Sequence, residues 1–173
     1  MMAGWRKVLW ISGVVALALL GSLTWYHDHY SMSHAASFEV GSLGSKPKVL
    51  IATQGSRFKD AVVQGLVARL RDRPAYIKVI DVSGLVGIEE TDWNAIVLIH
   101  TWEYMKPEFQ ARAFIDRATD RRRIIDLGTS GSGDLRFEGI DALSSASTMD
   151  DVPARVAELA ARVDAAIEVD YRP

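Results

Sequence analysis

Along the chain, hydrophobic positions form one long uncharged run near the N-terminus and then, after a polar stretch, shorter segments of alternating type. Residues 8–26 carry no charged side chain, and as a helix they would rise roughly 28 Å, close to the ~30 Å hydrocarbon core of a bilayer. Trp5 and Trp10 stand at one end of this run and Trp25 and Tyr26 at the other, where aromatic rings favour the headgroup level. The run therefore predicts one transmembrane helix.

A cleaved secretory signal is the alternative interpretation of the same run, with Arg6 and Lys7 as its charged start. However, the run is long for a signal core, and the small-residue site at 33–35 (Ser-His-Ala) lies well past it. We therefore interpret residues 8–26 as an uncleaved anchor that follows a short tail, residues 1–7.

The distribution of positive charge predicts the orientation of this anchor. Arg6 and Lys7 precede the run, and the next basic residues, Lys46 and Lys48, are too far beyond it to count. This bias places the N-terminus in the cytoplasm and the following domain outside the inner (plasma) membrane, in the periplasm of a Gram-negative cell.

Residues 27–47 lack sustained periodicity and are rich in Ser, Gly and His, which is typical of a tether. His27, His29 and His34 are metal ligands by residue type, but no carboxylate cage accompanies them. We interpret them as interfacial side chains and expect no metal site.

Residues 48–169 alternate strand patterns with helix patterns. Short continuous apolar runs predict buried strands, and apolar residues recurring at every third or fourth position predict amphipathic helices. The predicted strands are residues 49–52, 75–82, 95–100, 123–128 and 140–147. The predicted helices are residues 58–70, 107–118 and 148–167, and the link 83–94 is too short for a full helix. In the first helix, Lys59 and Asp60 fall off the apolar face.

Strands that alternate with helices predict an α/β domain, in which five parallel strands form a doubly wound sheet covered on both faces. Ligands of such sheets bind outside the carboxyl ends of the strands. Three segments would meet at that edge, namely residues 53–59, 100–107 and 129–134.

Composition excludes several kinds of chemistry. Lys and Arg number 20 and Asp and Glu 22, so the net charge of −2 lacks the positive excess of a nucleic-acid-binding protein. The run Arg121-Arg122-Arg123 is interpreted as a solvated turn. Without cysteine there is no disulfide, iron–sulfur cluster or thiolate zinc site. Residues 128–131 do not match the hydrolase elbow, no phosphate-loop motif exists, and no residue is assigned a catalytic role.

At the three edge segments the sequence resembles the flavodoxins, whose first loop commonly reads Ser/Thr-x-Thr-Gly-x-Thr. The corresponding segments here are Ala52-Thr53-Gln54-Gly55-Ser56-Arg57, His100-Thr101-Trp102-Glu103-Tyr104-Met105-Lys106-Pro107 and Gly128-Thr129-Ser130-Gly131-Ser132-Gly133. The likeness covers roughly residues 48–168 and rests on the order of the patterns more than on any single motif.

The resemblance implies a strand order of 2-1-3-4-5 and a site for flavin mononucleotide (FMN). Its phosphate would be held by Thr53, Gln54, Gly55, Ser56 and Arg57. Its flavin ring would lie against Thr101, Trp102, Glu103, Tyr104, Thr129, Ser130 and Gly131.

The first loop departs from the flavodoxin pattern, because Gln54 and Arg57 replace hydroxyl residues that usually bond the phosphate. Backbone N–H groups at a helix start could still hold an anion. In the second loop, Trp102 and Tyr104 could face a flavin ring together, or Trp102 could pack over the edge of its own sheet or bind a partner. The Gly/Ser segment is either a ring contact or a plain turn.

Two functions agree with these observations. The first is a membrane-anchored redox accessory that carries, or formerly carried, FMN beside a membrane electron-transfer complex; if active, it would be an FMN-dependent electron carrier or oxidoreductase. The second is a cofactor-free structural or accessory subunit of an inner-membrane respiratory complex. The altered first loop favours the second, as do Gly13 and Gly21, which allow close helix approach within the span.

Overall fold

A computed structural model describes residues 10–22 and 33–170 of the chain. The chain divides into two units between Met32 and Ser33, and each is described by itself. In the first unit, residues 10–22 form a helix whose side chains are all exposed. Among the described residues, no helix combines the length and apolar character needed to cross a bilayer. Part of the predicted span, residues 8–9 and 23–26, lies outside the described residues, as do Trp5, Arg6, Lys7, His27 and His29, so the transmembrane helix stays a prediction.

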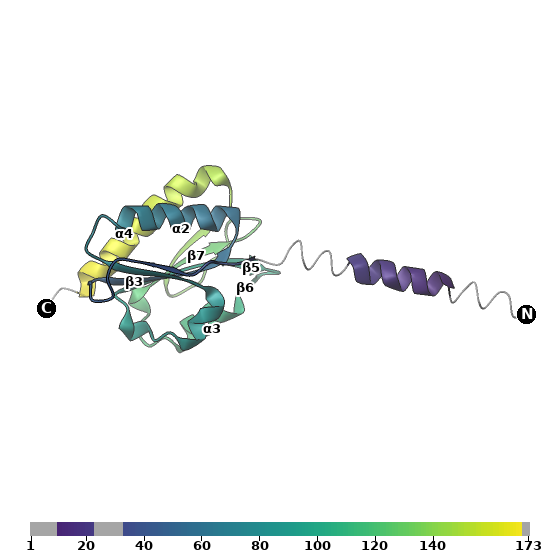
Figure 1. The fold of residues 1–173 in the computed structure, drawn as a ribbon, viewed down its shortest axis with the longest axis horizontal. Coiled ribbons are helices and arrows are strands. Elements are labelled where there is room, and N and C mark those ends of the chain that lie inside the picture. The colour runs from purple at the N-terminus through teal and green to yellow at the C-terminus, as the bar shows by residue number, and fades with distance from the viewer. Residues whose placement is uncertain (1–9, 23–32, 171–173) are drawn as a thin grey trace, which may run out of the picture. The chain divides into compact units, whose positions relative to one another are not determined.

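The second unit is an α/β domain around one mainly parallel sheet (Figure 1). Its parallel strands are β3 (Lys48–Gly55), β4 (Tyr76–Asp81), β5 (Ala95–Glu103), β7 (Ile124–Thr129) and β8 (Asp141–Ser145). They lie side by side in the order β4-β3-β5-β7-β8. Counted among the parallel strands alone, this is the order 2-1-3-4-5.

The predicted number of five strands is wrong, because three short antiparallel strands bring the sheet to eight. They are β1 (Ser33–His34) against β3, β2 (Phe38–Val40) against β4, and β6 (Lys106–Pro107) against β5. Each has two or three residues, too few for a hydrophobic period to show in the sequence. Two of them lie in the stretch interpreted as a tether, so the folded unit begins at Ser33 rather than at Lys48.

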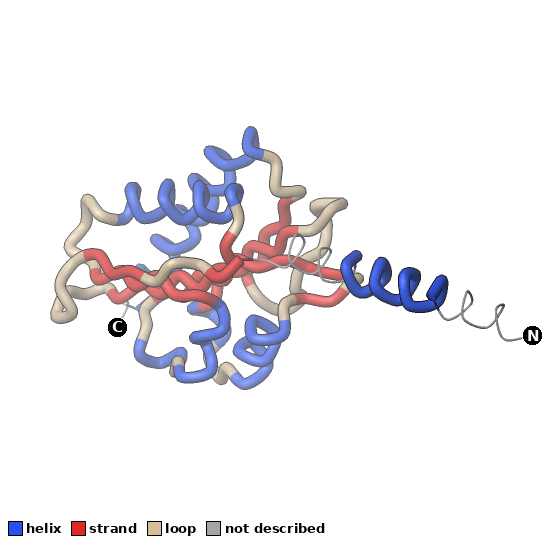
Figure 2. The backbone as a smooth tube through the Cα atoms, turned by 45° about the vertical axis from the view of Figure 1, so that its right-hand side comes forward, coloured by secondary structure: helices blue, strands red, loops and turns tan. Residues whose placement is uncertain are grey.

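Helices cover both faces of the sheet, as the alternating pattern predicted (Figure 2). On one face lie α2 (Arg57–Leu70) and α4 (Val152–Asp170). On the other lie α3 (Phe109–Arg117) and the short 3₁₀ helix η1 (Val82–Gly87). The link between β4 and β5 holds only 3₁₀ turns, which confirms the prediction that it lacks a full helix.

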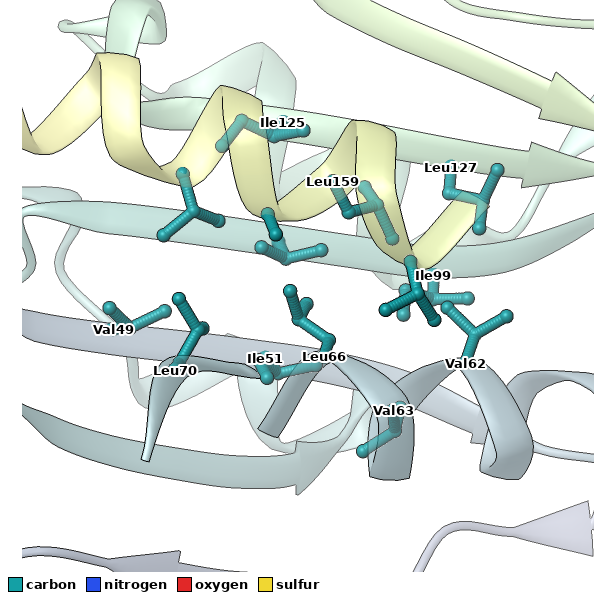
Figure 3. Close-up of a cluster of buried hydrophobic side chains, with 14 of the residues drawn as sticks. Val49, Ile51, Val62, Val63, Leu66, Leu70, Ile99, Ile125, Leu127 and Leu159 are labelled. Carbon is teal, nitrogen blue, oxygen red and sulfur yellow. The ribbon is translucent and has the colours of Figure 1, made fainter. Parts of the chain in front are cut away.

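The core on the α2–α4 face is built from alternate residues of the central strands. Val49 and Ile51 of β3 meet Leu66 of α2 and Leu159 of α4, and all four are fully buried (Figure 3). Burial on both faces is why these strands read as continuous apolar runs in the sequence. Because the five strands are parallel, the ends of β3, β5 and β7 come to one edge, called here the carboxyl edge.

Candidate functional site

At the carboxyl edge, β3 passes into α2 without a loop. The strand ends at Gly55, Ser56 is the N-cap, and the helix begins at Arg57. The Ser56 hydroxyl accepts a hydrogen bond from Lys59 N at 3.3 Å, and the Thr53 hydroxyl donates to the Gln54 carbonyl at 3.0 Å. The polar groups predicted to hold a phosphate therefore serve the helix cap and the local backbone.

The end of β3 is covered by β1. Ser33 pairs with Gly55 and His34 with Gln54, and the Ser33 hydroxyl donates to the Gly55 carbonyl at 3.0 Å. A Cβ atom on Gly55 would lie 2.7 Å from the backbone oxygen of Ser33, which is closer than real Cβ contacts come. Glycine is thus required here by the close approach of β1.

Asp81, at the end of β4, holds this covering segment in place. Its carboxylate accepts from Ala35 N at 2.8 Å and lies 3.3 Å from His34 Nδ1. Burial pushes the pKa of Asp81 up, but hydrogen bonds from Ser83, Ala35 and His34 outweigh burial and lower this pKa overall. His34, considered in the sequence as a metal ligand, contacts the Asp81 carboxylate instead. In the described residues no cluster of His, Asp and Glu could hold a metal ion.

Replacing Gly55 with alanine is expected to separate β1 from β3 and to lower the free energy of unfolding by about 1 kcal/mol, since one bridged pair and one hydrogen bond are lost. Chemical denaturation measures the loss, and faster amide exchange at Ser33 and His34 locates it. Gly44→Ala is the matched control, because no atom lies within 4 Å of its added Cβ. Equal exchange at Ser33 in both variants would contradict the assigned contact.

The interior of the carboxyl edge is occupied by Lys59. Its side chain is only 2% exposed, and Nζ donates to the Thr101 hydroxyl at 2.7 Å. The Thr101 hydroxyl also lies 3.2 Å from that of Thr129, and Thr101 N donates to the Gln54 side chain at 2.7 Å. Burial lowers the pKa of Lys59 to about 8, although the negative charges of Asp60 and Glu103 oppose the shift. Gln54, Lys59, Thr101 and Thr129 thus form one hydrogen-bonded cluster, and the sequence had placed Lys59 off the apolar face.

Trp102 lies on the α3 face of the sheet. A Cβ added to Gly128 would be 2.6 Å from Trp102 Nε1, so the indole rests directly on that glycine. Its ring centroid is 5.3 Å from that of Phe137 and 6.2 Å from that of His100. The indole therefore packs within the protein, in the manner of the structural alternative considered from the sequence.

Behind this aromatic cluster lies a buried pair that the sequence analysis missed. His100 Nε2 is 3.0 Å from Asp126 Oδ1, and both side chains are fully buried. Burial raises the pKa of Asp126, and His100 partly offsets that rise. The available signal was a carboxylate inside the apolar run Ile124-Ile125-Asp126-Leu127, because buried charges are almost always paired.

The remaining predicted site residues are divided between a closed turn and the surface. Ser130 N donates to the Ser145 carbonyl of β8 at 3.1 Å, and the Ser130 hydroxyl accepts from Gly133 N at 2.9 Å, so Ser130 is bonded to the neighbouring strand and within its own turn. Exposed side chains or glycines at the edge are Arg57, Glu103, Tyr104 and Gly131. A cavity of about 340 Å³ at this edge lies between the covering segment and α2, lined among others by His34, Asp60 and Gln64.

No protein-family model matches the chain, and no curated protein matches it. Solved structures do match. A flavodoxin from the domain Archaea is 12% identical, with 69% of this chain and 98% of that chain covered and a TM-score of 0.47. Oxidised Flavodoxin 2 from Bacillus cereus is 17% identical, with 68% and 98% covered and a TM-score of 0.40. The NAD(P)H:quinone oxidoreductase from Methanothermobacter marburgensis is 10% identical, with 73% and 98% covered and a TM-score of 0.41.

The fold is flavodoxin-like. That assignment rests on the parallel strands β4-β3-β5-β7-β8 with helices on both faces. Because many unrelated functions share such a fold, the function has to be argued from the carboxyl edge itself.

Proposed function

We propose that this chain is a cofactor-free accessory protein built on a flavodoxin-like fold, anchored in the inner membrane and acting through contacts with a larger membrane protein complex. One observation carries the proposal. At the junction of β3 and α2, where the flavodoxin resemblance calls for a phosphate loop, the strand runs straight into the helix and β1 covers its end.

The residues at that junction do not fit the phosphate of FMN. Ser56 already accepts the Lys59 N–H, and Gly55 lies against Ser33. Of the two cations at this junction, Arg57 is exposed, whereas Lys59 is almost fully buried and donates to Thr101. A phosphate would have to displace β1 and break this cluster, and each broken hydrogen bond leaves a buried polar group that costs about 1–3 kcal/mol.

The residues proposed for the flavin ring fit it no better. Trp102 is half-buried and packs against Gly128 and Phe137, so part of its indole surface is taken up by the protein itself. Ser130 is bonded within its own turn. Only Tyr104 remains as an exposed aromatic of the predicted set, and a single exposed ring does not make a flavin pocket, which buries most of its ligand.

The redox alternative is an FMN-dependent electron carrier or oxidoreductase. The observation that favours it is the order of the parallel strands, β4-β3-β5-β7-β8, which is the order that the flavodoxin resemblance implies. It shares with the main proposal the anchor at residues 8–26, a cytoplasmic N-terminus, a periplasmic domain and a partner complex in the membrane. The two proposals differ in whether flavin is bound.

Visible absorption of the purified full chain in mild detergent distinguishes them. The protein is expected to be colourless and to leave the fluorescence of added FMN unquenched, while a flavodoxin treated in parallel is yellow and quenches it. Stoichiometric flavin absorption, or quenching by wild-type protein, would contradict the cofactor-free proposal. Co-purification of the tagged chain with a membrane complex from native membranes tests the accessory role separately.

A further inference from the structure

Exposed apolar side chains concentrate on one short segment of the domain. Tyr104 is 84%, Met105 73% and Phe109 74% exposed. Within described residues 33–170, the other large exposed hydrophobics, Phe38, Leu43, Val86 and Met149, are scattered along the chain. Single exposed hydrophobics are ordinary, whereas these three fall within six consecutive residues, called here the hairpin tip.

The backbone of the hairpin tip is strained. Glu103 pairs with Lys106, so Tyr104 and Met105 form a two-residue turn, with φ angles of 50° and 64°. Such turns favour Asn-Gly. At positive φ most side chains crowd the backbone, whereas Gly has none and the short polar side chains of Asn and Asp are tolerated. The base of the hairpin is fixed, since Trp102 is packed on Gly128 and paired with Pro107. Two large apolar residues in place of Asn-Gly therefore work against folding.

The chemistry of the tip suits the interface of a lipid bilayer. Tyrosine has an apolar ring with a polar end, and aromatic rings of this kind gather at the headgroup level. Methionine adapts to irregular apolar surroundings. The charged residues Glu103 and Lys106 flank the turn and pair with each other. A lysine at such a position can lay its apolar stem along lipid while its ammonium stays in water.

The tip is small for a protein partner. Stable protein interfaces take about 20–30 residues a side, far more than this segment offers. A bilayer imposes no such threshold, because each inserted apolar group adds its own burial energy.

The chain enters the domain at the edge that carries the hairpin tip. Ser33 pairs with Gly55 at the carboxyl edge, and β5 runs past the last residue of β7 at the same edge before turning into β6 (Figure 1). Seven residue steps separate Tyr26, the end of the proposed span, from Ser33, a reach of at most about 25 Å. If residues 8–26 are the anchor, the carboxyl edge is within reach of the membrane surface.

We propose that the hairpin tip, Tyr104 and Met105 with Phe109, inserts into the headgroup region of the bilayer and turns the carboxyl edge toward the membrane. The proposal rests on the membrane anchoring given under the proposed function. It assigns the surface a lipid partner and gives a reason for the strained turn.

The natural absence of cysteine allows a direct test on the full chain. A fluorophore is attached to Met105→Cys or, as the matched control, to Leu43→Cys, whose side chain is similarly exposed and precedes the amino end of β3. Both proteins are reconstituted in phosphatidylcholine vesicles containing nitroxide-headgroup lipid. Quenching is expected to be several-fold stronger at position 105. Equal quenching at the two positions would overturn the proposal, and contact with a protein partner alone would give that result.

Flotation of the vesicles separates failure of the anchor from failure of the tip. If the chain does not float with the vesicles, the proposed anchoring is wrong and the proposal falls with it; if it floats and the quenching is equal, only the tip assignment is wrong. A second variant, Tyr104→Asn with Met105→Gly, keeps a turn that this geometry favours. The fluorophore is then attached to Arg57→Cys, an exposed position at the same edge. Its quenching is expected to be weaker in the Tyr104→Asn, Met105→Gly protein than in the protein with the natural turn. Unchanged quenching at position 57 would contradict the orienting role.

Discussion

Replacing Lys59 with methionine is expected to raise the free energy of unfolding by about 2 kcal/mol at pH 7. Burial lowers the pKa of this lysine from 10.5 to about 8, a difference worth about 3 kcal/mol against the charged form. The variant also loses the hydrogen bond from Nζ to Thr101, which lowers its free energy of unfolding by about 1 kcal/mol. Methionine has a similar length and no charge, so it fills the same volume without the cost of a buried ammonium.

The stability difference between Lys59→Met and the wild type is expected to depend on pH. Between pH 8 and 10.5 the unfolded chain keeps the proton on Lys59 while the folded chain has lost it, so the unfolded state binds more protons. The stability of the wild type attributable to this group therefore rises with pH across that range. The advantage of Lys59→Met should shrink from pH 8 to 10.5, as measured by urea denaturation at each pH. Lys46→Met is the control, because Lys46 is exposed, and its difference from wild type should not vary.

The same variant bears on the cofactor. If an anion were held at the carboxyl edge, Lys59 would be the cation nearest the cluster of Thr101 and Thr129, and its loss would abolish binding. A gain of stability with no change in visible absorption agrees with a cluster that serves only the fold. Destabilisation at pH 7, or a constant difference across the pH range, would contradict the burial argument.

Adding a methyl group at Gly128 is expected to lower the free energy of unfolding by about 2 kcal/mol. In Gly128→Ala the new Cβ would lie 2.6 Å from Trp102 Nε1 and 3.0 Å from the Leu135 carbonyl, so the indole has to move off the sheet. It would lose its contacts with Phe137 and His100, and overpacking of this kind costs about 1–3 kcal/mol. Gly131→Ala is the matched control, because its Cβ would meet open space.

A double-mutant cycle with Trp102→Ala isolates the contact. Removing the indole should relieve the clash, so Gly128→Ala should cost at least about 1 kcal/mol less in the Trp102→Ala background than in the wild type. Additive effects would show that the indole does not rest on the glycine. In the flavin interpretation, Trp102→Ala would chiefly release cofactor; here it is expected to act on stability.

Much of the architecture could be read from local patterns. The apolar run at β5 predicted a strand buried on both faces, and every residue from Ala95 to His100 is buried. The repeating apolar positions of 58–70 and 148–167 predicted α2 and α4, which cover one face of the sheet. A period of two or about four residues is a property of a single segment, so the sequence carries it without knowledge of the rest of the chain.

The candidate site could be predicted only in part. The alternation of strand and helix placed Gln54, Thr101 and Thr129 at one edge, and hydrogen bonds now link them. What each side chain does there was beyond the sequence. The sequence pattern predicts that Lys59 faces solvent, yet its side chain is buried and its ammonium reaches Thr101 of β5. His100 and Asp126 lie 26 positions apart, and only the pairing of β5 with β7 brings them together.

Local patterns in the sequence located the five long strands and the three helices of the domain, indicated a mainly parallel sheet, and showed which edge gathers the polar segments. Tertiary structure alone decided that β1 closes the end of β3, that Trp102 turns inward, and that Tyr104 and Met105 stand outward on a strained turn. Two-residue strands such as β1 and β6 have no hydrophobic period of their own. They form where a folded sheet leaves backbone N–H and C=O groups unpaired, and such an edge exists only once the sheet is assembled.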